Sequence, residues 1–271
     1  MPELPEVETT KRGITPHILH KTVARVILRH PTLRWPIPTN LSELLTQHIV
    51  TTVARRGKYI LLSINQGTLI LHLGMSGVLR IVRNDTTPAK HDHVDLQFTN
   101  GTCLRFSDPR RFGCVLWTAE DPHQHSLLNK LAPEPLSSEF NTDYLFTKSR
   151  KKSVSAKQFL MNNHHVVGVG NIYANECLFA AGVSPKRAAG KLTHDECKKL
   201  VTSIKNVLRK AIRFGGTTLK DFTDSDGKPG YFRNELQVYG HGKEPCPKCG
   251  TKLKELRQGG RATVYCLKCQ R

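Results

Sequence analysis

Residues 246–269 read CPKCGTKLKELRQGGRATVYCLKC and contain the most specific pattern in the chain. Two Cys-x-x-Cys pairs, sixteen residues apart, form its ends: Cys246, Cys249, Cys266 and Cys269. A two-residue spacer lets both thiolates of a pair reach one ion, and two such pairs complete the tetrahedral shell of a structural zinc site. The segment between them, with a turn at Gly259-Gly260, is typical of the β-hairpin of a zinc ribbon. We therefore predict one structural Zn²⁺ with four cysteine ligands and no open position for catalysis.

Two other chemistries use paired cysteines, namely redox dithiols and iron–sulfur clusters. A redox dithiol requires one Cys-x-x-Cys on a βαβ frame, and the sequence around these cysteines does not show that frame. Zinc is therefore the favoured interpretation. The remaining cysteines occur in apolar stretches, which is typical of inert core thiols: Cys103, Cys114, Cys177 and Cys197.

The chain is strongly basic. It has 271 residues, with 41 Lys or Arg against 22 Asp or Glu, for a formal net charge of +19. Such a surplus opposes compaction by self-repulsion, and its usual use is to bind a polyanion. Nucleic acid is the first candidate, although charge alone also allows an anionic membrane surface or an acidic protein.

The composition excludes several classes of protein. With 38% hydrophobic and 23% charged residues, the chain is expected to fold rather than to be disordered. Its apolar runs stop far short of the ~18 residues that a membrane span requires. The opening MPELPEVETT lacks the basic and apolar segments of a signal peptide. We expect a cytoplasmic protein without a membrane partner.

The first half of the chain has the pattern of a β-domain behind one helix. Acidic residues at its start and spaced apolar residues predict that helix over residues 6–20. Asn100-Gly101 predicts a type I′ hairpin turn. Close spacing of seven short segments predicts a β-sandwich or a barrel. These segments are Val23–Leu28, Val50–Ala54, Tyr59–Ile64, Thr68–Leu73, Val78–Val82, Val94–Phe98 and Thr102–Phe106.

The second half becomes helical after the Pro-rich residues 132–135. One helix is expected to begin near Asn171 and to end at Gly182. A capping box, Thr193-His-Asp-Glu196, opens a longer helix whose apolar residues share one face. These features predict a small helical domain before the cysteine-rich segment.

Pro2 is a candidate nucleophile. It is a small residue directly after Met1, so removal of the initiator methionine would expose a secondary amine beside Glu3. An α-amino group titrates near ~7.7–8.0, so an appreciable fraction is neutral and nucleophilic at physiological pH. Attack of a secondary amine on a sugar C1′ would give an iminium ion, which is a good electron sink. By itself, however, Pro2 is better interpreted as an ordinary second residue.

Ordered segments along the whole chain resemble the formamidopyrimidine-DNA glycosylase family. Together with the cysteine pairs they are highly specific, although no single one is decisive. The segments are PELPEVET (2–9), RRGKYILL (55–62), HLGMSG (72–77), KHDHVDL (90–96), DPRRFG (108–113), VVGVGNIYANE (166–176), GGTTLKDF (215–222), DGKPGYF (226–232), ELQVYG (235–240) and RATVYC (261–266).

This resemblance implies an α+β multidomain fold. Residues 1–131 would form an N-terminal β-sandwich catalytic domain with a flanking N-terminal helix. Residues 132–236 would form a helical helix–two-turn–helix DNA-binding domain, and residues 237–271 a C-terminal four-cysteine zinc-finger β-hairpin.

The resemblance also implies a base-excision repair enzyme acting on damaged double-stranded DNA. Such an enzyme removes oxidised purines, among them 8-oxoguanine and formamidopyrimidines, and nicks the abasic strand by β,δ-elimination. It would work as a monomer without a small-molecule cofactor. The PELPE opening favours this purine-directed branch over the related endonuclease VIII enzymes, which open with PEGPE.

Four residues match the family's catalytic positions. Pro2 matches the nucleophile that forms a Schiff base with C1′, and Glu3 matches the acid/base that assists ring opening and base departure. Lys58 matches the proton donor for β-elimination, which also contacts a phosphate. Arg261 matches the finger arginine that grips the phosphates beside the lesion and is assigned to δ-elimination.

Five further residues match DNA-contacting positions. Met75, Arg110 and Phe112 match the residues that fill the void left by the flipped base, and Arg110 would also check the estranged cytosine. His91 matches a DNA-contacting histidine. Asn171 matches the phosphate-binding asparagine, at a helix start where the backbone favours an anion. Met75 and Phe112 also have an ordinary interpretation as core residues, Arg110 as a surface residue and Asn171 as an N-cap.

One region departs from the family pattern. Ser153 stands where a lysine is expected, so the phosphate contact could move to Lys152. Lys157 still matches a family lysine near the lesion phosphate, although such charge runs are more often solvated faces. Residues 226–232 match the mobile loop that covers the flipped base.

Three alternatives remain open at this point. An endonuclease VIII-like glycosylase would act on oxidised pyrimidines. A non-catalytic zinc-ribbon nucleic-acid-binding protein would keep the charge and the cysteines but form no covalent intermediate. An RNA-modifying protein would prefer structured RNA.

Overall fold

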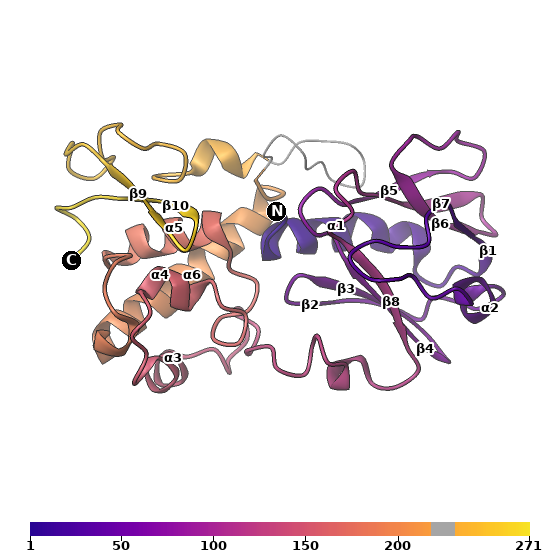
Figure 1. Ribbon diagram of the computed structural model, residues 1–271, viewed down its shortest axis with the longest axis horizontal. Helices are drawn as coiled ribbons and strands as arrows, with labels where there is room; N and C mark the ends of the chain where they lie inside the picture. Colours follow the sequence, from indigo (N-terminus) through magenta and orange to yellow (C-terminus); the bar gives the residue numbers. More distant parts are fainter. Residues whose placement is uncertain (218–230) are drawn as a thin grey trace. The chain divides into compact units, whose positions relative to one another are not determined.

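The computed structural model describes residues 1–217 and 231–271. The chain divides into two compact units (Figure 1). The first unit contains Met1–Asn129 and Phe214–Tyr231, and the second contains Lys130–Arg213 and Phe232–Arg271.

The first unit is a β-sandwich. Its two four-stranded sheets are separate, which decides between the sandwich and the barrel that the strand spacing allowed. One sheet has, in order, β1 (Val23–Leu28), β6 (Asp92–Phe98), β7 (Thr102–Ser107) and β5 (Val78–Arg83). The other has β2 (Thr52–Arg56), β3 (Tyr59–Ile64), β4 (Gly67–His72) and β8 (Cys114–Thr118). Side chains from both sheets, such as Leu62 and Phe106, belong to one hydrophobic core.

The N-terminal helix α1 (Leu4–Ile18) begins two residues earlier than the apolar pattern predicts. Glu3 is its N-cap and Pro5 lies in its first turn, where proline costs no hydrogen bond. One face of α1 buries Leu4, Val7 and Ile14 to 1% exposure or less, and Val7 and Ile14 belong to the sandwich core. The rest of the unit contains α2 (Leu41–Leu45) and the 3₁₀ turn η1 (Pro122–Gln124). Neither α2 nor β8 was expected from the sequence.

The β6–β7 turn differs from its prediction. Gly101 has a φ of +83°, but Asn100 is not among the residues with positive φ, whereas a type I′ turn needs both. Three residues, 99–101, connect the strands. The Asn100 side-chain oxygen accepts hydrogen bonds from the Thr102 amide and hydroxyl at 3.2 and 2.7 Å. The hairpin is therefore present with a longer turn, closed by the asparagine side chain.

The second unit contains the helices. The capping box at Thr193 is confirmed, because the Thr193 amide donates to Glu196 Oε2 at 2.8 Å and the Glu196 amide donates to Thr193 Oγ1 at 3.2 Å. The expected end of α5 is also confirmed, since Gly182 is its C-cap with a φ of +71°. The helices and 3₁₀ turns are α3 (Thr142–Ser149), α4 (Ala156–Leu160), α5 (Asn171–Ala181), η2 (Ala189–Lys191), α6 (His194–Arg213) and η3 (Phe232–Glu235).

A β-hairpin completes this unit. Its strands β9 (Lys254–Gln258) and β10 (Arg261–Tyr265) are joined by Gly259 and Gly260, which both have positive φ as a two-residue type I′ turn requires. Phe179 of α5 shares a hydrophobic cluster with hairpin residues, among them Val264. The hairpin therefore packs on α5 rather than standing alone.

The predicted fold class is confirmed: two β-sheets behind a helix, a helical region and a C-terminal cysteine-bearing hairpin. The predicted boundaries after residues 131 and 236 stay predictions. The two compact units group the chain differently, with residues 214–231 in the sandwich unit and the hairpin in the helical one. In the part of the chain that the structure describes, no helix is long and apolar enough to cross a membrane.

The fold predicts a pH dependence of stability through His72, the last residue of β4. Its Nδ1 accepts a hydrogen bond from the Gly74 amide at 2.9 Å. Burial, with the nearby charges of Lys58 and Arg34, lowers the pKa of His72 from 6.5 to about 4. The unfolded chain binds a proton on His72 more tightly than the folded protein does. The contribution of His72 to the free energy of unfolding is therefore complete above pH 6.5 and is lost as the pH falls towards 4.

We expect the free energy of unfolding to fall by about 2 kcal/mol more between pH 7.5 and 5 in the wild-type protein than in His72→Asn. Asparagine keeps an acceptor for the Gly74 amide and does not titrate. Urea unfolding at both pH values measures the difference. Identical pH dependence in the two proteins would contradict this role of His72.

Candidate functional site

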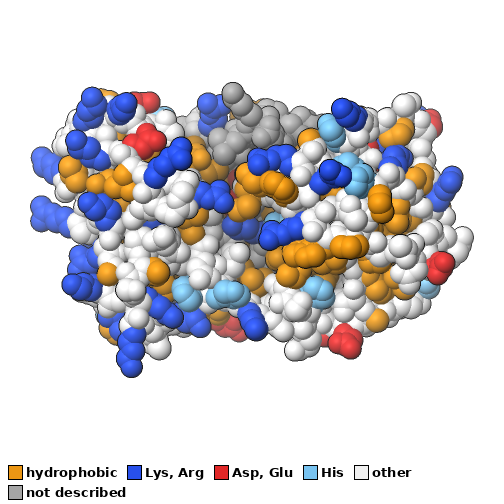
Figure 2. Space-filling view, viewed as in Figure 1, with side chains coloured by type: hydrophobic (Ala, Val, Ile, Leu, Met, Phe, Trp, Pro, Cys, Tyr) orange, Lys and Arg blue, Asp and Glu red, His pale blue; other side chains and the backbone are white. Residues whose placement is uncertain are grey.

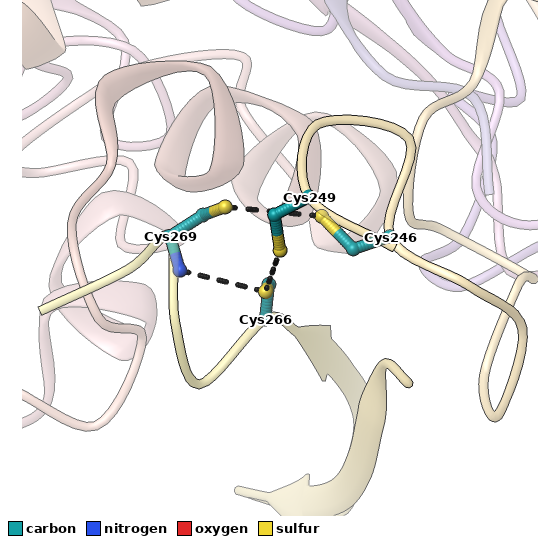
Figure 3. A group of neighbouring side chains, drawn as sticks. All are labelled: Cys246, Cys249, Cys266 and Cys269. Atoms are coloured by element: carbon teal, nitrogen blue, oxygen red, sulfur yellow. Dashed lines mark hydrogen bonds between the residues drawn. The ribbon is translucent and has the colours of Figure 1, made fainter. Parts of the chain in front are cut away.

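The four paired cysteines converge on one point in the second unit. Their sulfur atoms all lie within 4.8 Å of one another, with 3.9 Å between those of Cys246 and Cys269 and 3.5 Å between those of Cys249 and Cys266 (Figure 3). One pair precedes β9 and the other follows β10, so the hairpin brings them together. This arrangement has the ligand number and type of a closed tetrahedral zinc site.

The four clustered thiols influence one another's ionisation. Hydrogen bonds from Thr251 lower the pKa of Cys249 to about 6. The pKa of Cys269 is raised to about 12, first because of its hydrogen bond with Cys249. One thiolate therefore opposes ionisation of the next, and binding of a cation by all four sulfur atoms would release protons. The four cysteines fit one structural Zn²⁺.

In the first unit, the N-terminal candidates are held by a residue that the sequence analysis missed. Pro2 and Glu3 are both buried, with Glu3 only 2% exposed. Glu6 Oε2 accepts the Glu3 amide at 2.8 Å, and Glu6 Oε1 accepts the Thr217 amide at the same distance. A Cβ on Gly216 would lie 2.9 Å from Glu6 Oε1, so only glycine fits there without a shift. The acid three residues after the N-cap was the available signal for Glu6.

Lys58 lies in the tight turn between β2 and β3 and is 6% exposed. Gly57 precedes it with a φ of +58°. Arg55 donates from its guanidinium to the Gly57 carbonyl and to Glu8 Oε2, both at 2.9 Å. These bonds tie the Lys58 turn to α1, the helix that carries Pro2 and Glu3 at its start.

Glu8 is the centre of this connection. Besides Arg55 it pairs with Lys11 at 3.0 Å and with Arg12 at 2.8 Å. Burial would raise the pKa of Glu8, but the hydrogen bonds from its basic neighbours outweigh that effect and lower it. Glu8 is therefore a carboxylate at physiological pH and holds α1 against the β2–β3 turn.

The three predicted void-filling residues lie on two adjacent loops. Met75 is partly buried, whereas Arg110 and Phe112 are exposed, Phe112 by 46%. The Arg110 guanidinium carbon lies 5.0 Å from the centre of the Phe112 ring, a cation–π contact. A groove of about 470 Å³ is lined by Ser76, Arg80, Lys90, His91 and Arg110 among others. The structure therefore brings His91 and Arg110 to one basic groove.

Asn171 is the first residue of α5 in the second unit. The chain enters α5 through Gly168, which has a φ of +82°, and through Gly170, which is the N-cap. No side chain caps the helix. Asn171 Oδ1 is buried and has no hydrogen-bond partner in the part of the chain that the structure describes. A helix start with a side-chain amide beside it is a suitable phosphate site.

Lys157, which matches a family lysine near the lesion phosphate, lies in the interior of the second unit. Its side chain is fully buried, and its ammonium donates to the Ala262 carbonyl at 2.6 Å and to Thr263 Oγ1 at 2.8 Å. Both acceptors belong to β10, directly after Arg261. Arg261 itself is exposed beside the hairpin turn. The geometry therefore gives Lys157 a contact with the strand that carries Arg261.

One amide and one carboxylate side chain of α5, Asn175 and Glu176, also bind the C-terminal part of the chain. The sequence analysis missed both. Asn175 Oδ1 accepts the Val264 amide at 2.8 Å, and Asn175 Nδ2 donates to the Asn171 carbonyl at 2.6 Å. Glu176 accepts the amides of residues 237, 238 and 239 at 2.8 to 3.0 Å. Burial raises the pKa of Glu176 above its usual value, and the hydrogen bonds from these amides oppose this shift only in part. Together these bonds join α5 to β10 and to residues 237–239, which precede the hairpin.

The remaining candidates are surface residues or lie outside the described chain. Lys152 and Ser153 are both exposed. Of the predicted lesion loop, residues 226–230 lie outside the described residues, and Phe232 is buried against Tyr173 with ring centres 5.7 Å apart. Lys and Arg side chains outnumber acidic ones on the face drawn in Figure 2.

Three family models match the chain in order. They describe the formamidopyrimidine-DNA glycosylase N-terminal domain (residues 1–115), the formamidopyrimidine-DNA glycosylase H2TH domain (131–223) and a zinc finger found in FPG and IleRS (243–271). A curated relative, the formamidopyrimidine-DNA glycosylase of Photobacterium damsela subsp. piscicida, is 57% identical over 270 residues and the match covers 100% of both chains.

Solved structures agree with these matches. The complex of a Lactococcus lactis Fpg mutant with Fapy-dG-containing DNA has a TM-score of 0.92 at 32% identity, covering 100% of each chain. The wild-type Lactococcus lactis protein, in a complex with DNA that contains an oxidised pyrimidine, has a TM-score of 0.91 at 32% identity with the same coverage. On its sequence, its fold and its cysteine cluster, the chain belongs to the formamidopyrimidine-DNA glycosylase family.

Proposed function

We propose that the protein is a bifunctional DNA glycosylase and abasic-site lyase that removes oxidised purines from duplex DNA in base-excision repair. The full-length match to curated formamidopyrimidine-DNA glycosylases, 57% identical over 270 residues, carries this proposal. The Lactococcus relative bound to Fapy-dG-containing DNA supports the substrate class. We place the activity in the cytoplasm and assign it to a single copy of the chain.

The first chemical step is base removal. Once Met1 is removed, the Pro2 nitrogen bonds to C1′ of the flipped nucleotide while the glycosidic bond breaks, and the base leaves with that electron pair and takes up a proton. Glu3 supplies and accepts protons as O4′ leaves C1′ and the sugar ring opens. The product is an iminium ion between Pro2 and C1′.

The second stage is strand cleavage. The iminium acidifies C2′, whose proton is removed as the bond from C3′ to the 3′-phosphate breaks. Lys58 serves this β-elimination as proton donor and contacts a phosphate. Loss of the C4′ proton then expels the 5′-phosphate from C5′, a δ-elimination that Arg261 assists by neutralising the departing phosphate. Water releases the sugar remnant from Pro2 and leaves a one-nucleotide gap.

DNA distortion makes the lesion accessible. Flipping the base leaves a void that Met75 and Phe112 fill by stacking, while the Arg110 fork reads the estranged cytosine. His91, Lys152 and Asn171 hold phosphates. We assign Lys157 to the support of the Arg261 strand, because its ammonium is buried against Ala262 and Thr263.

Oxidised pyrimidines are a second candidate substrate class. The observation in favour is that a relative at 32% identity forms a complex with DNA containing an oxidised pyrimidine. Comparing cleavage of thymine glycol and 8-oxoguanine duplexes decides between the classes, and we expect 8-oxoguanine to be the better substrate.

Borohydride trapping tests the proposed chemistry. With an 8-oxoguanine:cytosine duplex, the wild-type protein should form a covalent complex, because borohydride reduces the iminium on Pro2. The complex should be lost in a chain extended at its N-terminus, which has no free amine at Pro2. It should be reduced in Pro2→Gly, whose primary amine forms an uncharged and less electrophilic imine. A chain extended at the C-terminus serves as the control. A folded wild-type protein that never crosslinks would refute the proposal.

Zinc removal tests the role of the cysteine cluster. A chelator, or Cys249→Ser, should reduce bound zinc from one ion per chain to none. DNA affinity should then fall by about 10- to 100-fold, because Arg261 loses the frame that aims it at the phosphates. Cys103→Ala, outside the cluster, should keep its zinc. Zinc analysis and fluorescence anisotropy provide the readouts, and undiminished DNA binding without zinc would contradict this role.

Two lysine variants separate support from phosphate contact. Lys157→Met should lower the melting temperature by about 5 °C, because a buried carbonyl and hydroxyl lose their donor. Lys152→Met, at an exposed position, should leave the melting temperature unchanged and reduce the slope of log affinity against log salt by about 0.9. A Lys157→Met protein with unchanged melting temperature and a reduced salt slope would show that this ammonium serves DNA instead.

A further inference from the structure

Asp108 is a fully buried carboxylate at the start of the loop that carries Arg110 and Phe112. Its Oδ1 accepts the Ser76 hydroxyl at 2.7 Å, and its Oδ2 accepts the Gly113 amide at 2.8 Å. The second bond closes the loop across its whole length, from residue 108 to residue 113. Burying a carboxylate is costly unless its oxygens are hydrogen-bonded, so these donors are central to the position of Asp108.

Ser76 extends this connection to the neighbouring loop. While its hydroxyl donates to Asp108, its oxygen accepts the backbone amide of Arg110 at 3.2 Å. Ser76 directly follows Met75 in the chain and is 6% exposed. One buried hydroxyl therefore fixes Met75 through its own backbone and Arg110 through a hydrogen bond.

The backbone of Asp108 reaches the third DNA-contacting segment. Its amide donates to the His91 carbonyl at 3.0 Å, and His93 Nε2 lies 2.8 Å from its carbonyl oxygen. The segments that carry Met75, His91 and Arg110 thus meet at one residue. All of these contacts lie within the first unit.

Close backbone packing leaves these loops little freedom to adjust. A Cβ on Gly74, which has a φ of +62°, would lie 2.4 Å from the Gly113 nitrogen, and one on Gly113 would lie 2.6 Å from the His72 carbonyl oxygen. Only glycines allow the two loops to approach this closely. Displacing either loop would therefore displace the other.

We propose that Ser76 and Asp108 are positioning residues that hold Met75, Arg110 and Phe112 as one preformed unit, and that they thereby set the selectivity for cytosine opposite the lesion. This inference rests on the proposed function. Recognition of a base by two hydrogen bonds from one guanidinium requires the position of that guanidinium to be fixed to a fraction of an ångström. A mobile guanidinium forms hydrogen bonds with more than one kind of base. In this role both residues act through Met75, Arg110 and Phe112.

The test compares three variants with the wild-type protein. Ser76→Ala removes the bridging hydroxyl, and Asp108→Asn keeps the shape of the side chain but removes its charge. Ser63→Ala is the matched control, since its hydroxyl lies 3.0 Å from that of Thr68 in the same unit and away from these loops. The substrates are 8-oxoguanine duplexes with cytosine or adenine opposite the lesion, and a single-stranded oligonucleotide with an abasic site, which has no opposite base.

In Ser76→Ala we expect the cytosine-over-adenine ratio of kcat/KM to fall by about three- to tenfold, mainly through KM for the cytosine duplex. Cleavage of the single-stranded abasic site should change by less than about twofold, within the usual spread of surface substitutions. Asp108→Asn, where it folds, should act in the same direction, and Ser63→Ala should keep the wild-type ratio.

Two results would overturn the inference while leaving the proposed function standing. One is a wild-type ratio in Ser76→Ala, and the other is a proportional loss on all three substrates together with a lower melting temperature, which a purely structural role produces. A wild-type protein that cleaves none of the substrates would overturn the proposed function itself, and this inference with it.

Discussion

Hydrogen bonds between buried charged side chains and the backbone of functional loops are the interaction on which the site depends. Glu6 accepts the Thr217 amide near the N-terminus, Asp108 closes the loop that carries Arg110 and Phe112, and Lys157 donates to the strand of Arg261. Burying a charge is expensive, and an apolar side chain would fill the same space at lower cost. An apolar side chain, however, cannot fix the direction of a peptide group. These residues therefore lower the free energy of unfolding relative to apolar side chains. In return they fix the backbone at positions that helix and strand hydrogen bonds do not hold.

Burial also divides the lysines and arginines of this basic chain into two groups, those fixed in one position and those exposed to solvent. A net charge of +19 explains attraction to a polyanion but not its cleavage. Lys58 and Lys157 are buried, in turns or against strands that fix them, whereas Lys152 is exposed. A buried lysine has lost its conformational freedom before DNA arrives, so its ammonium acts at one place only. Most of the remaining lysines and arginines contribute to long-range attraction and to the release of counterions.

Local patterns made much of the fold predictable. The zinc hairpin follows from cysteine spacing and two glycines, and the capping box at Thr193 follows from four consecutive residues, because both signals act over short distances. Strand β8, Cys114–Thr118, escaped prediction because it is five residues long and lacks polar alternation. The supporting contacts could not be predicted for a different reason: Glu6 and Thr217 are 211 residues apart, and Glu176 is 62 residues from Val238. Lys157 looked like part of a solvated charge run because nothing local in the sequence encodes its burial.

The association of the zinc hairpin with the helices follows from its size. Two five-residue strands by themselves bury too little apolar surface to be stable alone. Phe179 completes the hairpin's hydrophobic cluster, and Asn175 Oδ1 accepts the Val264 amide of β10. Because Asn175 Nδ2 also donates to the Asn171 carbonyl, the N-terminal end of α5, where we propose phosphate binding, and the strand of Arg261 share one connection. The metal then fixes the far end of the hairpin and α5 fixes its face, so that a single arginine at the turn is held from both sides.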